Sequence, residues 1–131
     1  MSDSKRSLRS DIARVRGLGS AKEGVQHWWM QRLSAVLLVP LALWFVAGIV
    51  CHTGADHAAI SAWLAQPLTF GLMVLFLGAS FYHGQLGLQV VIEDYVHHEA
   101  AKITLIVLAK LAALALALAT LVALMVIAFG S

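Results

Sequence analysis

Three long apolar runs constrain what this chain can fold into more than any other feature of its sequence. They extend over residues 33–50, 68–92 and 103–129, and each is long enough for an α-helix to cross about 30 Å of hydrocarbon. Of the 131 residues, 60% are hydrophobic and only 12% are charged, a balance that does not suit a soluble domain of this size. We therefore predict an all-α membrane protein with three transmembrane helices, at about residues 33–52, 68–92 and 103–129.

The residues before the first run form a polar arm, which divides the chain into two predicted parts. Residues 1–32 are expected to be a cytoplasmic arm with an interfacial segment, and residues 33–131 a three-helix transmembrane anchor domain. Trp63, in a short amphipathic stretch at residues 58–65, is expected at the opposite membrane interface. Three glycines discourage one continuous helix in the arm: Gly17, Gly19 and Gly24.

Positive charge predicts the orientation of the spans. Seven lysine and arginine residues precede the first span, none lies in the connection 51–67, and Lys102 lies in the next connection. By the positive-inside rule, the N-terminus and the connection 93–102 face the cytoplasm, and the C-terminus faces the periplasm. Because the basic residues cluster where a topology signal belongs, nucleic acid is not expected as a partner. Asp3 and Asp11 interrupt what could otherwise resemble a mitochondrial transit peptide, so we predict a multi-pass protein of a bacterial inner membrane.

The sequence offers little for a metal cluster of its own. Cys51 is the only cysteine, so any iron–sulfur cluster belongs to a partner. His97 and His98 are adjacent, which on a helix would direct them about 100° apart, and no further ligands appear at suitable spacing. They are expected in a solvated loop, and so are His52 and His57.

The second apolar run contains an ionisable side chain, His83, near its middle. Such a residue is costly inside a bilayer and persists where it has a partner, and neutral imidazole binds metals well. At 100° per residue, Gly87, Val90 and Asp94 share one helix face with His83, and the glycine leaves room for a planar macrocycle to approach the backbone. The same pattern also fits a histidine that hydrogen-bonds a neighbouring helix, with the small residues serving helix packing.

Three more residues stand at the cytoplasmic ends of the predicted spans. Asp94 and Tyr95 end the second span, and Arg32 starts the first. A phenol hydroxyl can donate a hydrogen bond to charge that develops on a carbonyl oxygen, and an acid beside it can supply a proton. Each residue also suits an ordinary role, Tyr95 in an aromatic belt, Asp94 as a loop-entry acid and Arg32 as a topology signal.

The stretch from Ser80 to Tyr95, S-F-Y-H-G-Q-L-G-L-Q-V-V-I-E-D-Y, resembles the small hydrophobic membrane-anchor subunit of bacterial succinate dehydrogenase, respiratory complex II. The specific part is the histidine followed at eleven and twelve residues by Asp-Tyr, in combination with three spans. The length, the arm and the segment from His27 to Arg32 also fit alphaproteobacterial members of this family.

What the resemblance implies can be placed on individual residues. His83 would be an axial ligand to the iron of haem b, with the second ligand from a partner anchor subunit, so the chain would be half of a two-subunit haem-binding helical bundle. Tyr95 would bind a ubiquinone carbonyl with Asp94 beside it, and Arg32 would lie near the haem propionates. No catalytic residue is assigned.

The implied function is that of a membrane-anchor subunit of succinate:ubiquinone oxidoreductase. Its partners would be a second membrane-anchor subunit of the cytochrome b type, an iron–sulfur subunit and a flavoprotein subunit, besides lipid and ubiquinone. FAD and iron–sulfur clusters would belong only to partner subunits, and the isolated chain would have no catalytic activity. Two alternatives stay open: a haem-free anchor of a related quinone oxidoreductase, and a small transporter subunit with His83 and Asp94 as a proton relay.

Overall fold

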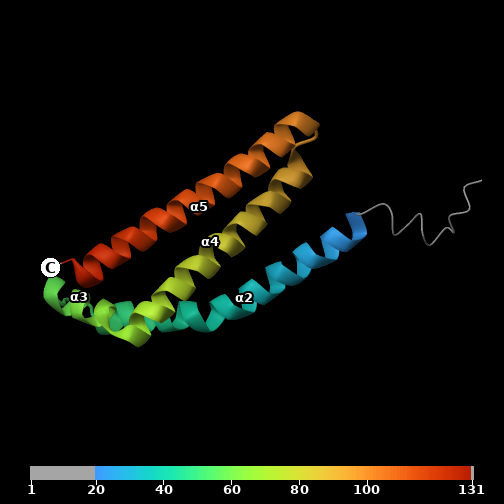
Figure 1. Ribbon diagram of the computed structural model, residues 1–131. Helices are drawn as coiled ribbons and strands as arrows, with labels where there is room; N and C mark the ends of the chain where they lie inside the picture. The colour runs from blue at the N-terminus through green and yellow to red at the C-terminus, as the bar shows by residue number, and fades with distance from the viewer. Residues whose placement is uncertain (1–19, 131) are drawn as a thin grey trace, which may run out of the picture. The chain divides into compact units, whose positions relative to one another are not determined.

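The computed structural model describes residues 20–130, so the first nineteen residues of the predicted arm lie outside the described part. This part is helical, and three of its helices are long and apolar enough to cross a membrane: α2 from Gly24 onward, α4 and α5. The prediction of an all-α chain with three candidate transmembrane helices is therefore confirmed. Figure 1 shows the elements in chain order: α2 (Ser20–Cys51), α3 (His57–Ala65), α4 (Pro67–Tyr95) and α5 (Glu99–Phe129).

The chain divides into two units after Met30, and α2 continues through the boundary. In the first unit the described chain is helical from Ser20, so Gly24 lies inside α2 and does not interrupt it. The predicted domain boundary after residue 32 stays a prediction.

Each long helix extends beyond the apolar run that predicts it. α4 continues to Tyr95 and α5 begins at Glu99, so only residues 96–98 connect them, whereas the sequence predicts a connection over residues 93–102. The difference arises because hydropathy reports only the part of a helix that suits hydrocarbon. Polar residues continue the same hydrogen-bonded helix beyond that part.

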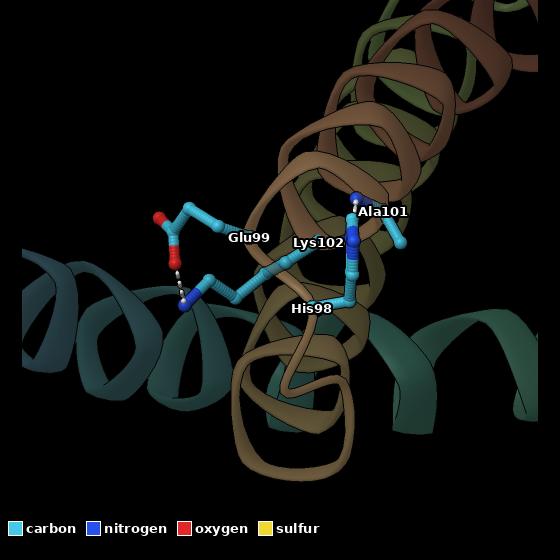
Figure 2. A network of polar contacts seen from close by, with 4 residues as sticks. All are labelled: His98, Glu99, Ala101 and Lys102. Carbon is cyan, nitrogen blue, oxygen red and sulfur yellow. Dashed lines mark hydrogen bonds and ion pairs between the residues drawn. The ribbon is translucent and has the colours of Figure 1, made fainter.

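Local capping explains where these helices begin. Pro67 stands at the first position of α4, where its missing N–H costs nothing and its fixed φ suits a helix. His98 is the N-cap of α5, and its Nδ1 accepts a hydrogen bond from the backbone N–H of Ala101 at 3.4 Å. Lys102 forms an ion pair with Glu99 at 3.0 Å in the first turn, as Figure 2 shows. His98 is thus part of a helix start, not of a metal site.

A tight reversal after α2 brings α3 back against it. Gly54 adopts a φ of +83°, a left-handed backbone conformation that residues with a Cβ rarely adopt. Asp56 then caps α3 by accepting a hydrogen bond from the N–H of Ala59 at 2.9 Å. This reversal corrects the expectation for His52, which is half-buried: its Nδ1 lies 2.8 Å from the carbonyl oxygen of Gly48.

Trp63 packs α3 against α2. Its ring lies against Gly48, stacks on the imidazole of His52 with a centroid separation of 4.4 Å, and lies 6.1 Å from the ring of Trp44. Glycine at position 48 permits this approach, because a Cβ there would lie 2.6 Å from Cζ2 of Trp63. The tryptophan that the sequence places at a membrane interface therefore has a packing role within the chain.

The internal core lies at the α3 end of the second unit. α4 and α5 run side by side, with the short α3 against both of them (Figure 1). One residue from each of these helices forms the buried cluster, namely Leu64, Met73 and Leu124. Aromatic side chains from α2, α3 and α4 pack around it: Trp44, Phe45, Trp63, Phe70 and Phe76.

Most of the apolar surface of the long helices is left uncovered. In the most apolar windows of α2 and α4 only 11% of residues are buried, and in α5 only 6%. A soluble protein could not leave helices of this hydropathy exposed to water. Lipid or other membrane helices must therefore cover these faces.

Candidate functional site

His83 lies in the middle of α4, where its ring is half-buried against α2. Nδ1 of His83 is 2.9 Å from Oγ of Ser34, a side chain that is only 7% exposed. Oγ of Ser34 in turn donates a hydrogen bond to the backbone carbonyl of Gln31 at 3.0 Å, one turn earlier in α2. An imidazole within a span thus has a hydrogen-bond partner on a neighbouring helix.

The contact belongs to a longer pairing between α2 and α4. Gln31 faces Gly87, Ser34 contacts His83, and Phe45 stacks on Phe76 with ring centroids 4.8 Å apart. Positions that advance along α2 meet positions that recede along α4, as antiparallel helices require. These three side-chain approaches place Ser34 at the level of His83.

Small residues beside His83 leave space next to the helix backbone. A Cβ added at Gly84 would meet no atom within 4 Å, and one added at Gly87 would meet only Nε2 of Gln31 at 3.7 Å. Oε1 of the same Gln31 side chain is buried and has no hydrogen-bond partner among the described residues. Gly84 also lines a groove between α4 and α5, whereas Gly87 lies against the Gln31 side chain of α2.

Asp94 and Tyr95 lie in the last turn of α4, and both are exposed, Tyr95 to 79%. Eleven and twelve residues of α-helix separate them from His83, so they stand about 17 to 18 Å along the axis from it. The structure therefore places the predicted quinone residues together at one helix end. It does not bring them to the imidazole.

Arg32 belongs to α2, one residue after Gln31, and its side chain is exposed. Two residues of helix turn 200°, so Arg32 lies on nearly the opposite side of α2 from Ser34. The predicted haem-propionate residue is thus not part of the Ser34–His83 contact.

Two residues of this site, Ser34 and Gln31, are missed by reasoning from the sequence. Ser34 is the only hydroxyl-bearing residue between Leu33 and Val50, and this was the available signal. The role of Ser34 depends on which residues of α4 lie opposite it. That pairing is set by the reversal through α3, which hydropathy does not report.

The other histidines do not assemble a competing centre. His97 and His57 are exposed, and His98 caps α5. Over residues 20–130, no group of three or more histidine, cysteine, aspartate and glutamate side chains could hold a metal ion. Lys110, on α5, lines a shallow groove between α4 and α5 with Tyr82 and Gln85.

These features define a class of protein: a multi-pass helical membrane subunit with an imidazole inside one span, a polar pair at the end of that span, and large faces left for partners. Residues 6–129 match the family described as succinate dehydrogenase/fumarate reductase transmembrane subunit. The chain belongs to this family, and the resemblance seen in the sequence is confirmed.

Curated relatives carry corresponding names. The succinate dehydrogenase hydrophobic membrane anchor subunit of Rickettsia bellii (strain RML369-C) is 36% identical over 104 residues, which cover 79% of this chain and 83% of that protein. The succinate dehydrogenase membrane anchor subunit of Reclinomonas americana is 30% identical over 96 residues, covering 71% and 80% respectively. The hydrophobic membrane anchor subunit of Paracoccus denitrificans is 33% identical over 79 residues, covering 60% and 61%. No solved structure matches the chain.

Proposed function

We propose that this chain is a membrane-anchor subunit of a succinate:ubiquinone oxidoreductase, that it supplies His83 as one axial ligand of haem b, and that it forms part of the ubiquinone site. Family membership supports the anchor role. The observation that carries the haem assignment is the half-buried imidazole within a span, hydrogen-bonded through Nδ1 and next to Gly84, where the helix surface is open.

The residues of this chain fit a haem. An imidazole binds iron through a neutral nitrogen, and the hydrogen bond at Nδ1 leaves Nε2 for that purpose. Bound there, a haem supplies reversible one-electron chemistry, tuned by its axial ligands and by burial. His83 would supply the ligand nitrogen, and Gly84 leaves the helix surface open beside it. A second histidine would come from the partner anchor subunit, since His83 is the only histidine inside the three apolar runs.

The ubiquinone site is proposed at the end of α4. The hydroxyl of Tyr95 would donate to a quinone carbonyl as negative charge develops on that oxygen, and Asp94 would hold a proton nearby. The exposure of Tyr95 to 79% supports a role toward a partner, because the ring has little contact within its own chain. Arg32 would approach the haem propionates from the far side of α2.

Orientation and partners complete the proposal. The bias of basic residues toward the N-terminal side favours an N-terminus in the cytoplasm and a C-terminus in the periplasm of a bacterial inner membrane. The iron–sulfur and flavoprotein subunits, which hold the clusters and FAD, would then bind on the cytoplasmic side of the membrane. The second anchor subunit would cover apolar faces of the long helices. Succinate chemistry would occur only in the flavoprotein subunit.

The test is His83→Ala in the complex purified from native membranes. We expect the reduced-minus-oxidised spectrum of b-type haem to disappear or change form, because one iron ligand is removed. His57→Ala is the matched control, since it deletes an exposed imidazole at the start of α3 and should leave the spectrum unchanged. An unaltered haem spectrum in His83→Ala would refute the haem assignment and favour a haem-free anchor.

A further inference from the structure

The hydroxyl of Ser34 lies 2.9 Å from Nδ1 of His83, close enough to determine which ring nitrogen carries the proton. We infer that Ser34 is a positioning residue that accepts a hydrogen bond from Nδ1–H of His83, holds Nε2 as the ligand nitrogen, and lowers the reduction potential of the proposed haem. This inference rests on the proposed function, because it assigns a role toward the haem to a residue outside the family motif.

The direction of the hydrogen bond follows from counting protons. A serine hydroxyl has one proton to donate and two lone pairs that accept. Oγ of Ser34 gives its proton to the carbonyl of Gln31 at 3.0 Å, a common arrangement for serine inside a helix. The 2.9 Å contact with Nδ1 of His83 can then be made only if the imidazole is the donor. The neutral ring therefore carries its proton on Nδ1 and its free lone pair on Nε2.

The two hydrogen bonds, from His83 to Ser34 and from Ser34 to Gln31, also change the electronic character of the imidazole ring. Donation from Oγ to a carbonyl polarises the hydroxyl and makes its oxygen a better acceptor. A metal-bound histidine that donates its other N–H becomes a more basic ligand. A more basic ligand stabilises ferric over ferrous iron, so Ser34 should hold the potential of the haem below the value it would have without the hydroxyl.

Burial makes this contact specific. Ser34 is 7% exposed, so few water molecules are available to replace its hydroxyl. Within residues 20–130, His83 makes its side-chain hydrogen bond with Ser34. Loss of the hydroxyl would leave Nδ1–H without an acceptor.

The experiment is a redox titration of haem b in the purified complex, followed optically, with low-temperature electron paramagnetic resonance of the oxidised haem. Ser34→Ala removes the acceptor and should raise the midpoint potential. A tenfold change in the preference for ferric over ferrous iron corresponds to about 59 mV for one electron. Ser34→Thr keeps a hydroxyl that can bond the same helix turn, so it should restore the unsubstituted potential and g-values.

Two further variants keep the result interpretable. Ser34→Cys has a similar size but accepts hydrogen bonds weakly, so its potential should lie between those of serine and alanine, even if Ser34→Ala assembles poorly. Thr120→Ala removes a hydroxyl that bonds the carbonyl of Leu116 within α5, and it should leave the potential unchanged.

The outcomes separate this inference from the proposed function. If the alanine and cysteine variants keep the unsubstituted potential and g-values, or if threonine shifts them as far as alanine does, Ser34 does not act on the haem. If the unsubstituted complex has no b-type spectrum, the haem assignment itself is wrong and the inference is overturned with it.

Discussion

The contact between His83 and Ser34 shows how a polar side chain can be accommodated within a transmembrane helix. An imidazole nitrogen without a partner in hydrocarbon would cost a few kcal/mol, by roughly the desolvation penalty of a polar group. The 2.9 Å contact with Ser34 removes most of that cost at one nitrogen. The second nitrogen stays available, which is the arrangement a ligand to a cofactor requires.

Tyr95→Phe tests the proposed quinone contact by changing a single side chain. It keeps the ring and removes one hydroxyl, whose hydrogen bond to developing charge should contribute about 1.5 to 3 kcal/mol. Succinate:ubiquinone activity of the purified complex should therefore fall roughly 10- to 150-fold.

Two controls accompany this measurement. Succinate oxidation with a soluble artificial acceptor and the haem spectrum should persist in Tyr95→Phe. Tyr82→Phe changes the only other tyrosine, which lies on a different face of α4, and should leave quinone turnover intact. Normal quinone turnover in Tyr95→Phe, or loss of its haem, would place Tyr95 outside the quinone site.

The sequence predicts the residues of the candidate site only where the pattern lies within one helix. His83, Gly87, Asp94 and Tyr95 can be related from spacing alone, because a single α-helix fixes their angles. Ser34 cannot be found in this way, because its contact depends on the register between two helices. Such a register is decided by packing at sites far away, including Trp63 in α3.

At the scale of elements, hydropathy predicts that helices exist but not where they end. The predicted spans fall inside α2, α4 and α5 except for residue 52, yet Asp94, Tyr95 and Glu99 are helical where a loop is expected. Caps decide these ends, and a cap depends on side-chain geometry, as the bond between His98 and Ala101 illustrates.

Gly48→Ala tests the packing of α3 on α2. The new methyl group would lie 2.6 Å from Cζ2 of Trp63, so the ring or the helix must shift. Overpacking of this kind typically costs about 1 to 3 kcal/mol. We expect a lower midpoint in thermal denaturation of the purified complex.

Gly71→Ala is the matched control, because a Cβ at this α4 position meets no atom within 4 Å. The added methyl group favours helix and should not lower the midpoint. Equal midpoints for the Gly48 and Gly71 variants would mean that Trp63 does not depend on close contact with α2.

At the scale of the whole molecule, the chain is a subunit with little core of its own. Its buried cluster lies at the end where α3 meets α4 and α5, and Leu41 and Leu86 are buried outside it. Large side chains such as Leu43, Leu111 and Val122 remain exposed. Between transmembrane helices, packing and hydrogen bonds hold subunits together, since lipid is as apolar as the side chains. Stability should therefore depend on the proposed partner anchor subunit.

A reporter fused after Ser131 tests the proposed orientation. In the proposed orientation, which follows from seven basic residues before the first span and from three spans, the C-terminus is periplasmic. A fused alkaline phosphatase should be active, and a fused green fluorescent protein should not fluoresce. The reverse pattern in both fusions would show that the number of spans or their orientation is wrong.

The connection between α4 and α5 has a consequence for how the chain lies in its membrane. Three extended residues, 96–98, span at most about 11 Å, roughly a third of the hydrocarbon thickness. Once α4 has crossed the bilayer, the first residues of α5 must lie at the membrane surface where α4 ends. In the membrane the two helices therefore form a hairpin whose bend stays at one surface, with the ion pair of Glu99 and Lys102 at that bend (Figure 2).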